Sequence, residues 1–247
     1  MTDTTVLLNG NVRTCADGVR GVEAVAIRGE RILAVGNIEE VRAAAGPDAE
    51  LIDLDGATVI PGLIDPHNHL LATGQVLGEI SLYDVRSIGE LQARVREAVD
   101  DASPRSWLLG RGWDETLLRE ERMPSRHDLD VVAPHNPVVL ERVWNKLVVN
   151  TAALRALGID QNTPDPPKDM NYAGGFDREE DGYPTGIFRD RAKDLVRLAM
   201  PQPSESDLVR AIARGSRAYN SLGVTSIIDP GLLPHQIDAF HRAADAG

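Results

Sequence analysis

The sequence predicts an α/β protein in which a small N-terminal β domain precedes an incomplete TIM-type (β/α)8 barrel. Three observations support this fold class. Residues 1–56 contain short apolar runs separated by turn signals, and residues 57–65 form a nearly uninterrupted apolar run. After that run, apolar segments alternate with stretches of helical periodicity, which is typical of parallel sheets whose strands are linked by helices.

Residues 1–56 predict the N-terminal β domain. Asn9-Gly10 lies between runs rich in β-branched residues, and such a dipeptide favours a hairpin turn because both residues tolerate positive φ. A short helical stretch over 38–45 ends at Gly46-Pro47, and the chain continues as a strand over 51–54. The pattern therefore indicates a small sheet with one short helix.

Residues 57–247 predict the first part of the barrel. The run over 57–65 has the composition of a strand that is buried on both faces. Residues 163–186, rich in Pro, Gly and Asp, predict a long irregular excursion within a larger insertion around residues 75–200. A complete barrel needs about 250 residues, so we expect an incomplete one. Further strands are predicted over 106–112, 137–143 and 224–229, and helices over 88–99, 188–199, 208–222 and 234–246.

Composition and charge exclude several classes of partner. The 247 residues include 38 acidic and 26 basic side chains, and the net charge of -12 repels nucleic acid and anionic membrane surfaces. The single cysteine, Cys15, cannot form an internal disulfide. The sequence shows no secretory signal and no apolar run of about 20 residues. We therefore expect a soluble cytoplasmic protein that binds neither nucleic acid nor a membrane.

His67 and His69 are the first candidate functional residues. Side chains two residues apart on a strand point to the same side, so the two imidazoles are expected to project together from the C-terminal end of the strand. Imidazole is a preferred ligand of zinc, and the catalytic groups of barrels gather at this end of the strands. The alternative is a pair of unrelated histidines in a strand-to-helix loop.

Residues 58–65, followed by His67 and His69, resemble the first barrel strand of the amidohydrolase superfamily, whose motif is V-x-P-G-x-I-D-x-H-x-H. Leu8-Asn9-Gly10 and residues 25–32 are similar to strands of the composite β-sandwich domain that precedes the barrel in that superfamily. The resemblance implies that His67 and His69 are the first two metal ligands.

Motifs in the middle of the chain resemble one branch of that superfamily, which includes N-substituted formamide deformylases and YtcJ-like proteins (amidohydrolase family 3). Lys146 stands where this branch often has a histidine, and Asp190 stands where a glutamate is usual. The resemblance spans nearly the whole chain and implies the N-terminal portion of such a protein. The motifs are Gly110-Arg111-Gly112-Trp113-Asp114-Glu115, Arg126-His127-Asp128-Leu129-Asp130, Asn150-Thr151-Ala152-Ala153-Leu154 and Pro184-Thr185-Gly186-Ile187.

Five residues are candidates for substrate contacts: Trp113, Asp114, Lys146, Asp190 and Asp229. Trp113 and Asp114 end a predicted strand, where they would line a substrate cavity; the alternative is a buried tryptophan followed by a capping aspartate. The departures at Lys146 and Asp190 are expected to alter substrate contacts. Asp229 ends the last predicted strand and faces the barrel mouth, either as a group that supports a ligand or substrate or in a structural role.

The resemblance implies a metal-dependent enzyme that hydrolyses a non-peptide carbon–nitrogen bond of the amide type in a small-molecule substrate. It implies one or two divalent metal ions, zinc first among them. The remaining ligands, a carboxylated lysine or a glutamate, two histidines and an aspartate, are expected mostly beyond Gly247. Association into a homo-oligomer is left open. The second hypothesis is a catalytically inactive fragment or interaction module that keeps the N-terminal half of such an enzyme.

Overall fold

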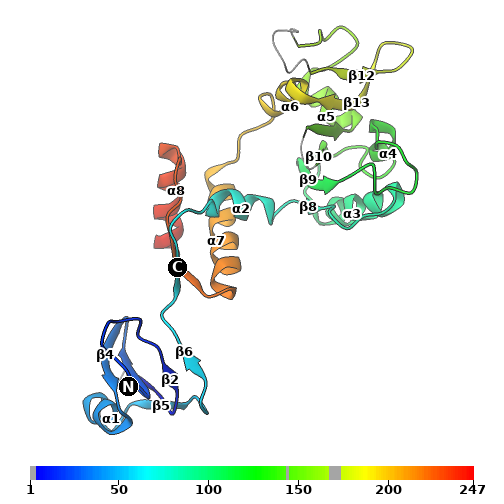
Figure 1. The fold of residues 1–247 in the computed structure, drawn as a ribbon. Coiled ribbons are helices and arrows are strands. Elements are labelled where there is room, and N and C mark those ends of the chain that lie inside the picture. The colour runs from blue at the N-terminus through cyan, green and yellow to red at the C-terminus, as the bar shows by residue number, and fades with distance from the viewer. Residues whose placement is uncertain (1–3, 143–144, 167–173) are drawn as a thin grey trace. The chain divides into compact units, whose positions relative to one another are not determined.

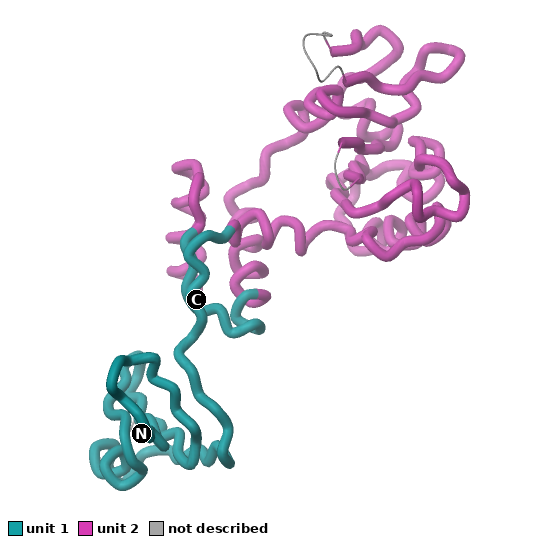
Figure 2. The backbone as a smooth tube through the Cα atoms, in the orientation of Figure 1, with its two compact units in different colours: residues 1–68, 219–228 teal, residues 69–218, 229–247 magenta. Residues whose placement is uncertain are grey.

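The structure is a computed structural model that describes residues 4–142, 145–166 and 174–247. Val143 and Trp144, at the end of a predicted strand, and residues 167–173 of the predicted excursion lie outside the described residues. The chain divides into two compact units (Figure 2). Unit 1 comprises Met1–Asn68 and Tyr219–Ile228, and unit 2 comprises His69–Ala218 and Asp229–Gly247. The first of the three boundaries between the units along the chain therefore falls between Asn68 and His69.

Unit 1, whose N-terminal residues are drawn in blue in Figure 1, contains a four-stranded sheet. Its strand order is β4-β3-β1-β5. β1 and β5 run parallel, and the other neighbours are antiparallel. Buried Val6, Ala24 and Ala26 of the sheet pack with Val41 and Ala45 of α1, so the core of this sheet lies beneath the helix. The elements are β1 (Thr4–Leu8), β3 (Ala24–Arg28), β4 (Arg31–Gly36), α1 (Ile38–Ala45) and β5 (Glu50–Asp53).

The apolar run over 57–65 forms two strands instead of the single predicted one. β6 (Thr58–Val59) pairs with β2 (Asn11–Val12), and β7 (Leu63–Asp65) pairs in parallel with β14 (Val224–Ile227). Pro61 lies between β6 and β7 and has no N–H for a strand ladder, which explains the interruption.

The prediction that this run is buried on both faces is wrong for the described residues. Ile64 in the middle of β7 is 70% exposed, and Leu63 and Ile60 are exposed as well. Burial on both faces requires packed layers on both sides of a sheet. Among the described residues, β7 and β14 form a two-stranded sheet, and the exposure of Ile64 and Leu63 shows that no such layer covers these side chains there.

In unit 2, α2 (Leu70–Val76) packs against α7 (Glu205–Ser221) through two glycines. A Cβ at Gly74 would lie 1.9 Å from the carbonyl oxygen of Ala211, and one at Gly215 would lie 2.8 Å from the carbonyl oxygen of Leu70. Because glycine has no Cβ, the two helix backbones approach more closely than other residues would allow. The last helix of this unit is α8 (Pro234–Asp245).

A six-stranded sheet forms the other part of unit 2, with strand order β12-β13-β11-β10-β9-β8. β8, β9 and β10 run parallel, whereas β11, β13 and β12 each run antiparallel to their neighbours. The parallel arrangement predicted for the strands over 106–112 and 137–143 is confirmed by the pairing of β9 with β10. The antiparallel strands β11, β12 and β13 were not predicted as strands. The strands are β8 (Ile80–Ser81), β9 (Leu108–Trp113), β10 (Val138–Arg142), β11 (Lys146–Val149), β12 (Phe176–Arg178) and β13 (Pro184–Arg189).

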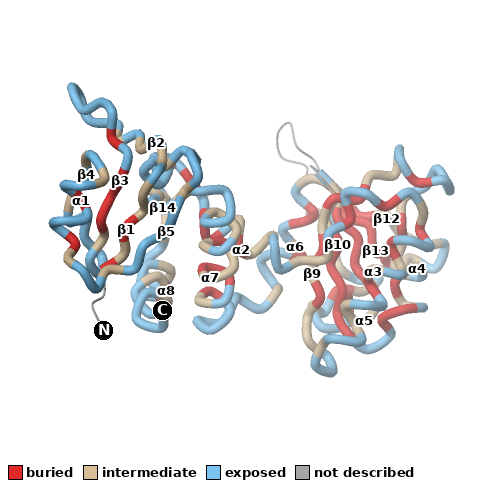
Figure 3. The backbone as a smooth tube through the Cα atoms, turned by 90° about the horizontal axis from the view of Figure 1, so that it is seen from below, coloured by how far each residue is buried: buried red, intermediate tan, exposed pale blue. Residues whose placement is uncertain are grey.

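Each face of this sheet carries its own apolar core, and Figure 3 shows buried residues concentrated along β9, β10 and β13. Successive residues of β11 serve opposite cores: Val148 packs with Leu91 of α3, and Leu147 packs with Leu154 of α5. This alternation follows from the two-residue period of a strand. The helices around the sheet are α3 (Ile88–Asp101), α4 (Arg126–Asp130), α5 (Thr151–Leu157) and α6 (Lys193–Arg197), with a 3-10 turn at Asp190–Ala192.

The predicted helix over 188–199 is wrong at its start. Phe188 belongs to β13, where its ring stacks on that of Phe176 at 5.1 Å between centroids, and α6 begins only at Lys193. The apolar spacing after Phe188 fits a helix as well as the end of a strand, so the sequence does not fix this boundary. The pairing of β13 with β11 places Phe188 in the strand.

The α/β class is confirmed. The incomplete barrel, the separate β domain over 1–56 and the insertion around 75–200 stay predictions. Over the ranges that the structure describes, no helix is long and apolar enough to cross a membrane.

The contact between α2 and α7 can be tested with Gly74→Ala. The added Cβ meets the backbone of α7, so we expect the free energy of unfolding, measured in urea, to fall by about 1–3 kcal/mol. Gly89→Ala in α3 is the matched control, because its nearest neighbour is 3.9 Å away. We expect that change to stabilise by about 0.5–1 kcal/mol. Equal effects of the two substitutions would contradict the close helix contact.

Candidate metal centre

His67 lies in unit 1, in the turn that follows β7. The Asp65 carboxylate accepts a hydrogen bond from the His67 backbone N–H at 3.2 Å and one from the Asn68 side-chain amide at 2.7 Å. The backbone N–H of Asn68 donates to the Ile228 carbonyl oxygen at 2.8 Å, and Ile228 N–H donates to the Asp65 carbonyl oxygen at 3.0 Å. The turn is therefore held by its own carboxylate and by the segment after β14, while the His67 residue is exposed.

These hydrogen bonds also set the charge of Asp65. The side-chain hydrogen bond from Asn68, followed by the backbone hydrogen bond from His67, holds the pKa of Asp65 below its ordinary value. Asp65 is thus a carboxylate at neutral pH. Its role is to fix the backbone around His67, because both of its described donors belong to the turn.

His69 lies in unit 2, at the residue that precedes α2. Its side chain is 60% exposed, and its Nδ1 lies 3.5 Å from Oδ1 of Asp229. The Asp229 side chain is only 6% exposed, and its Oδ2 accepts a hydrogen bond from the backbone N–H of Leu71 at 3.2 Å. Asp229 therefore contacts both the imidazole of His69 and the first turn of α2.

The donor chemistry of His67 and His69 fits the imidazole ligands of a zinc-type ion, since both residues are exposed and one ring has a carboxylate beside Nδ1. Between them, Asn68 has a buried side-chain oxygen with no hydrogen-bond partner. Within 4–142, 145–166 and 174–247, no group of three or more His, Cys, Asp or Glu side chains could hold a metal. The metal-ligand roles of His67 and His69 stay predictions.

Trp113, a predicted substrate contact, is fully buried at the end of β9. Its indole N–H donates to the carbonyl oxygen of Leu140 at 3.0 Å, and the ring belongs to the core between the sheet and α3. These contacts correspond to the structural alternative, a buried tryptophan with a satisfied N–H.

Asp114 and Lys146 lie in one cluster of charged side chains at the ends of β9, β10 and β11. Glu115 links the cluster: its Oε1 lies 2.5 Å from Lys146 Nζ, and its Oε2 lies 2.5 Å from Arg142 Nε. Arg142 Nη2 also lies 3.1 Å from Oδ1 of Asp114. All four side chains are mostly buried, so this is a fixed network and not a solvated surface group.

The network decides the charge states of its members. Burial raises the pKa of Glu115, but the hydrogen bonds from Lys146 and Arg142 outweigh it and leave this pKa below its ordinary value. Glu115 and Arg142 were not singled out from the sequence. Glu115 is adjacent to Asp114 in its motif, but only the pairing of β9 with β10 brings Arg142 to it.

Asp190 follows β13 and has φ of +49°, a backbone conformation that non-glycine residues rarely adopt. Its N–H donates to the carbonyl oxygen of Asn145 at 2.8 Å, directly before Lys146. Strained backbone of this kind persists where surrounding contacts hold it, and it is enriched at functional sites. The substrate roles of Trp113, Asp114, Lys146, Asp190 and Asp229 stay predictions.

Solved structures define the class of protein. The crystal structure of an uncharacterized metal-dependent hydrolase from Pyrococcus furiosus matches this chain with a TM-score of 0.76 and 29% sequence identity. The match covers 99% of this chain and 48% of that chain. A similar hydrolase from Pyrococcus horikoshii OT3 has the same fold, with a TM-score of 0.74. The chain thus shares the fold of the part, 48%, of the Pyrococcus furiosus metal-dependent hydrolase that the match covers.

Sequence comparison defines the family. The profile of the amidohydrolase family matches residues 50–247. The N-substituted formamide deformylase of Arthrobacter pascens is 32% identical over 98% of this chain and 45% of its own length. The putative amidohydrolase YtcJ of Bacillus subtilis (strain 168) is 32% identical over 82% of this chain and 38% of its own. The chain belongs to the amidohydrolase family and spans less than half the length of these relatives.

The charged network can be tested with Glu115→Gln, which leaves Lys146 and Arg142 without their shared carboxylate. We expect the free energy of unfolding to fall by about 1–3 kcal/mol at pH 7. Because the pKa of Glu115 in the folded protein lies below its ordinary value of 4.5, its stabilisation is fully present above pH 4.5. It is lost as the pH falls through the folded-state pKa, so the two proteins should converge in acid.

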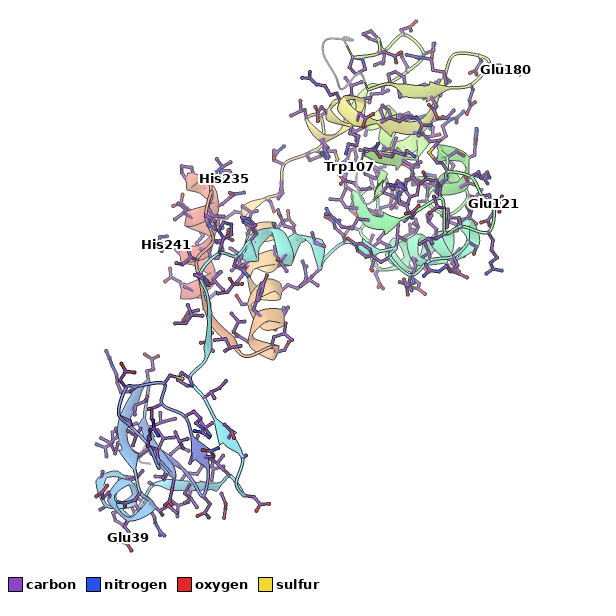
Figure 4. All side chains as sticks on the ribbon, viewed as in Figure 1. Glu39, Trp107, Glu121, Glu180, His235 and His241 are labelled. Carbon is purple, nitrogen blue, oxygen red and sulfur yellow. The ribbon has the colours of Figure 1, made fainter. Side chains whose placement is uncertain are left out.

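Glu180→Gln is the matched control, since Glu180 is an exposed glutamate of the same unit (Figure 4). We expect its effect on the unfolding free energy to stay within about 0.5 kcal/mol at either pH. A Glu115→Gln deficit that does not shrink in acid would contradict the assigned charge state.

Proposed function

We propose that His67 and His69 are two imidazole ligands of a divalent metal, zinc, in an enzyme that hydrolyses an amide-type carbon–nitrogen bond in a small molecule. The observation that carries the proposal is the His-x-His pair directly after the parallel strand β7, with the Asp229 carboxylate beside His69 Nδ1. A carboxylate behind a metal-binding imidazole is the usual arrangement in zinc sites.

The substrate class that we propose follows from the relatives. A protein that is 32% identical is named N-substituted formamide deformylase, so N-substituted formamides are the first substrates to test. Because this chain spans less than half of that enzyme, the complete activity of a longer protein is part of the proposal. One or two metal ions, a cytoplasmic location and a homo-oligomer belong to the same proposal.

The chemistry divides between the ion and the side chains. When bound, a zinc-type ion polarises a carbonyl group and lowers the pKa of water. Asp65 holds the backbone that carries His67, and Asp229 lies behind His69. We propose that Lys146, a member of the charged network, and Asp190, which follows β13, contact the substrate. In the charged network the Lys146 ammonium group is paired with the Glu115 carboxylate. Its position is therefore fixed, and its positive charge is largely balanced by that carboxylate.

The test is to measure zinc content and hydrolysis of N-substituted formamides for wild type, His67→Ala and His69→Ala. Each substitution removes one imidazole donor, so we expect zinc affinity and hydrolysis to fall by at least about 100-fold. His241→Ala is the control, because His241 is exposed on α8 (Figure 4). It should change neither quantity.

Two outcomes would count against the proposal. Unchanged zinc content in both histidine variants would exclude these residues as ligands. Zinc bound normally without hydrolysis of any amide-type substrate would favour the second hypothesis, a catalytically inactive fragment or interaction module that keeps the N-terminal half of such an enzyme.

A further inference from the structure

We propose that Asp229 is a positioning residue that holds the His69 imidazole with its proton on Nδ1, so that Nε2 is the atom offered to a metal. The inference rests on the proposed function for the identity of the ligand. The tautomer itself is a property of the metal-free chain and can be measured independently. Asp229 acts through His69 and contacts neither substrate nor metal in this proposal.

The side chain of Asp229 is buried. A carboxylate that is 6% exposed needs hydrogen-bond donors, since an unpaired buried charge is strongly unfavourable. One oxygen accepts from the Leu71 N–H, and the other lies 3.5 Å from His69 Nδ1. The second oxygen thus faces a ring nitrogen that can donate when it carries the proton.

The neighbours of the His69 ring decide which of its two nitrogens carries the proton. A neutral imidazole carries its proton on one nitrogen and presents a lone pair on the other, and a neighbouring acceptor decides which. An acceptor beside Nδ1 favours the Nδ1–H tautomer, which leaves the Nε2 lone pair for a metal. At 3.5 Å the contact is longer than an ordinary hydrogen bond, and the carboxylate oxygen is the acceptor that the structure places beside Nδ1.

Asp229 also binds Leu71 N–H in the first turn of α2, and His69 immediately precedes that helix. One carboxylate therefore ties the imidazole to the start of the helix that follows it. The contact with Asp229 therefore restrains the orientation of the His69 ring, although the His69 side chain is exposed.

The competing explanation is that Asp229 only stabilises the start of α2. Asp229→Asn separates the two roles. Its amide oxygen can still accept from Leu71 N–H, while its NH2 group, which donates, replaces the oxygen beside Nδ1. A donor at that position favours the opposite tautomer, with the proton on Nε2, while leaving the local geometry in place.

The direct measurement is the tautomer of each histidine in the metal-free chain, from the ¹⁵N chemical shifts of the ring nitrogens at a pH where the rings are neutral. We expect His69 to be mainly the Nδ1–H tautomer in wild type and mainly the Nε2–H tautomer in Asp229→Asn. The tautomer of His241 on α8 should be the same in both proteins.

The second measurement is the affinity for Zn²⁺ alone, determined by competition with a chelator. We expect Asp229→Asn to bind Zn²⁺ about 10- to 100-fold more weakly than wild type. Asp207→Asn is the matched control: its carboxylate accepts from the Ser204 N–H at 2.9 Å before α7, so it removes a helix-start carboxylate distant in sequence from His69. Its Zn²⁺ affinity and histidine tautomers should match those of wild type.

The outcomes separate this inference from the proposed function. A switched tautomer together with weaker Zn²⁺ binding supports both. A switched tautomer in a chain that binds no Zn²⁺ supports the positioning role and overturns the metal site. The Nδ1–H tautomer retained in Asp229→Asn, or Nε2–H already present in wild type, overturns the positioning role whatever the Zn²⁺ affinity.

Discussion

The parallel pairing of β7 with β14 is the contact on which the turn that carries His67 depends. Ile228, directly after β14, donates to the Asp65 carbonyl and accepts from the Asn68 N–H, so the turn that carries His67 is held at both ends. A turn of this length without such contacts would sample many backbone conformations, each fixed residue costing about 1–2 kcal/mol in entropy. The pairing of β7 with β14 therefore fixes the backbone around His67, which the local sequence alone does not fix.

Carboxylates with defined donors recur wherever this chain carries candidate chemistry. Asp65 binds the turn after β7, Asp229 binds the start of α2, and Glu115 binds Lys146 and Arg142. In each case the negative charge is used to hold other groups, because a partly buried carboxylate is stable only with donors around it. The acidic residues at these three sites therefore have a structural role.

Several features were predictable because they depend on short spacings. The His-x-His pair, the predicted turns and the helices α3 and α7 follow from local patterns, and the structure contains these helices. The antiparallel strands β11 to β13 and the break at Pro61 were not predicted, since apolar runs do not encode their partners. Arg142 was missed as a partner of Glu115 for the same reason: the two meet only through strand pairing.

The sequence by itself determined the family, the α/β class and the two histidines of the His-x-His motif. These features depend on which residues stand at short, fixed intervals. Only the tertiary structure decided that Asp229 lies beside His69 and that Trp113 is buried against Leu140. Such contacts join segments that are distant along the chain. They are set by strand register and helix packing, which residue spacing does not specify.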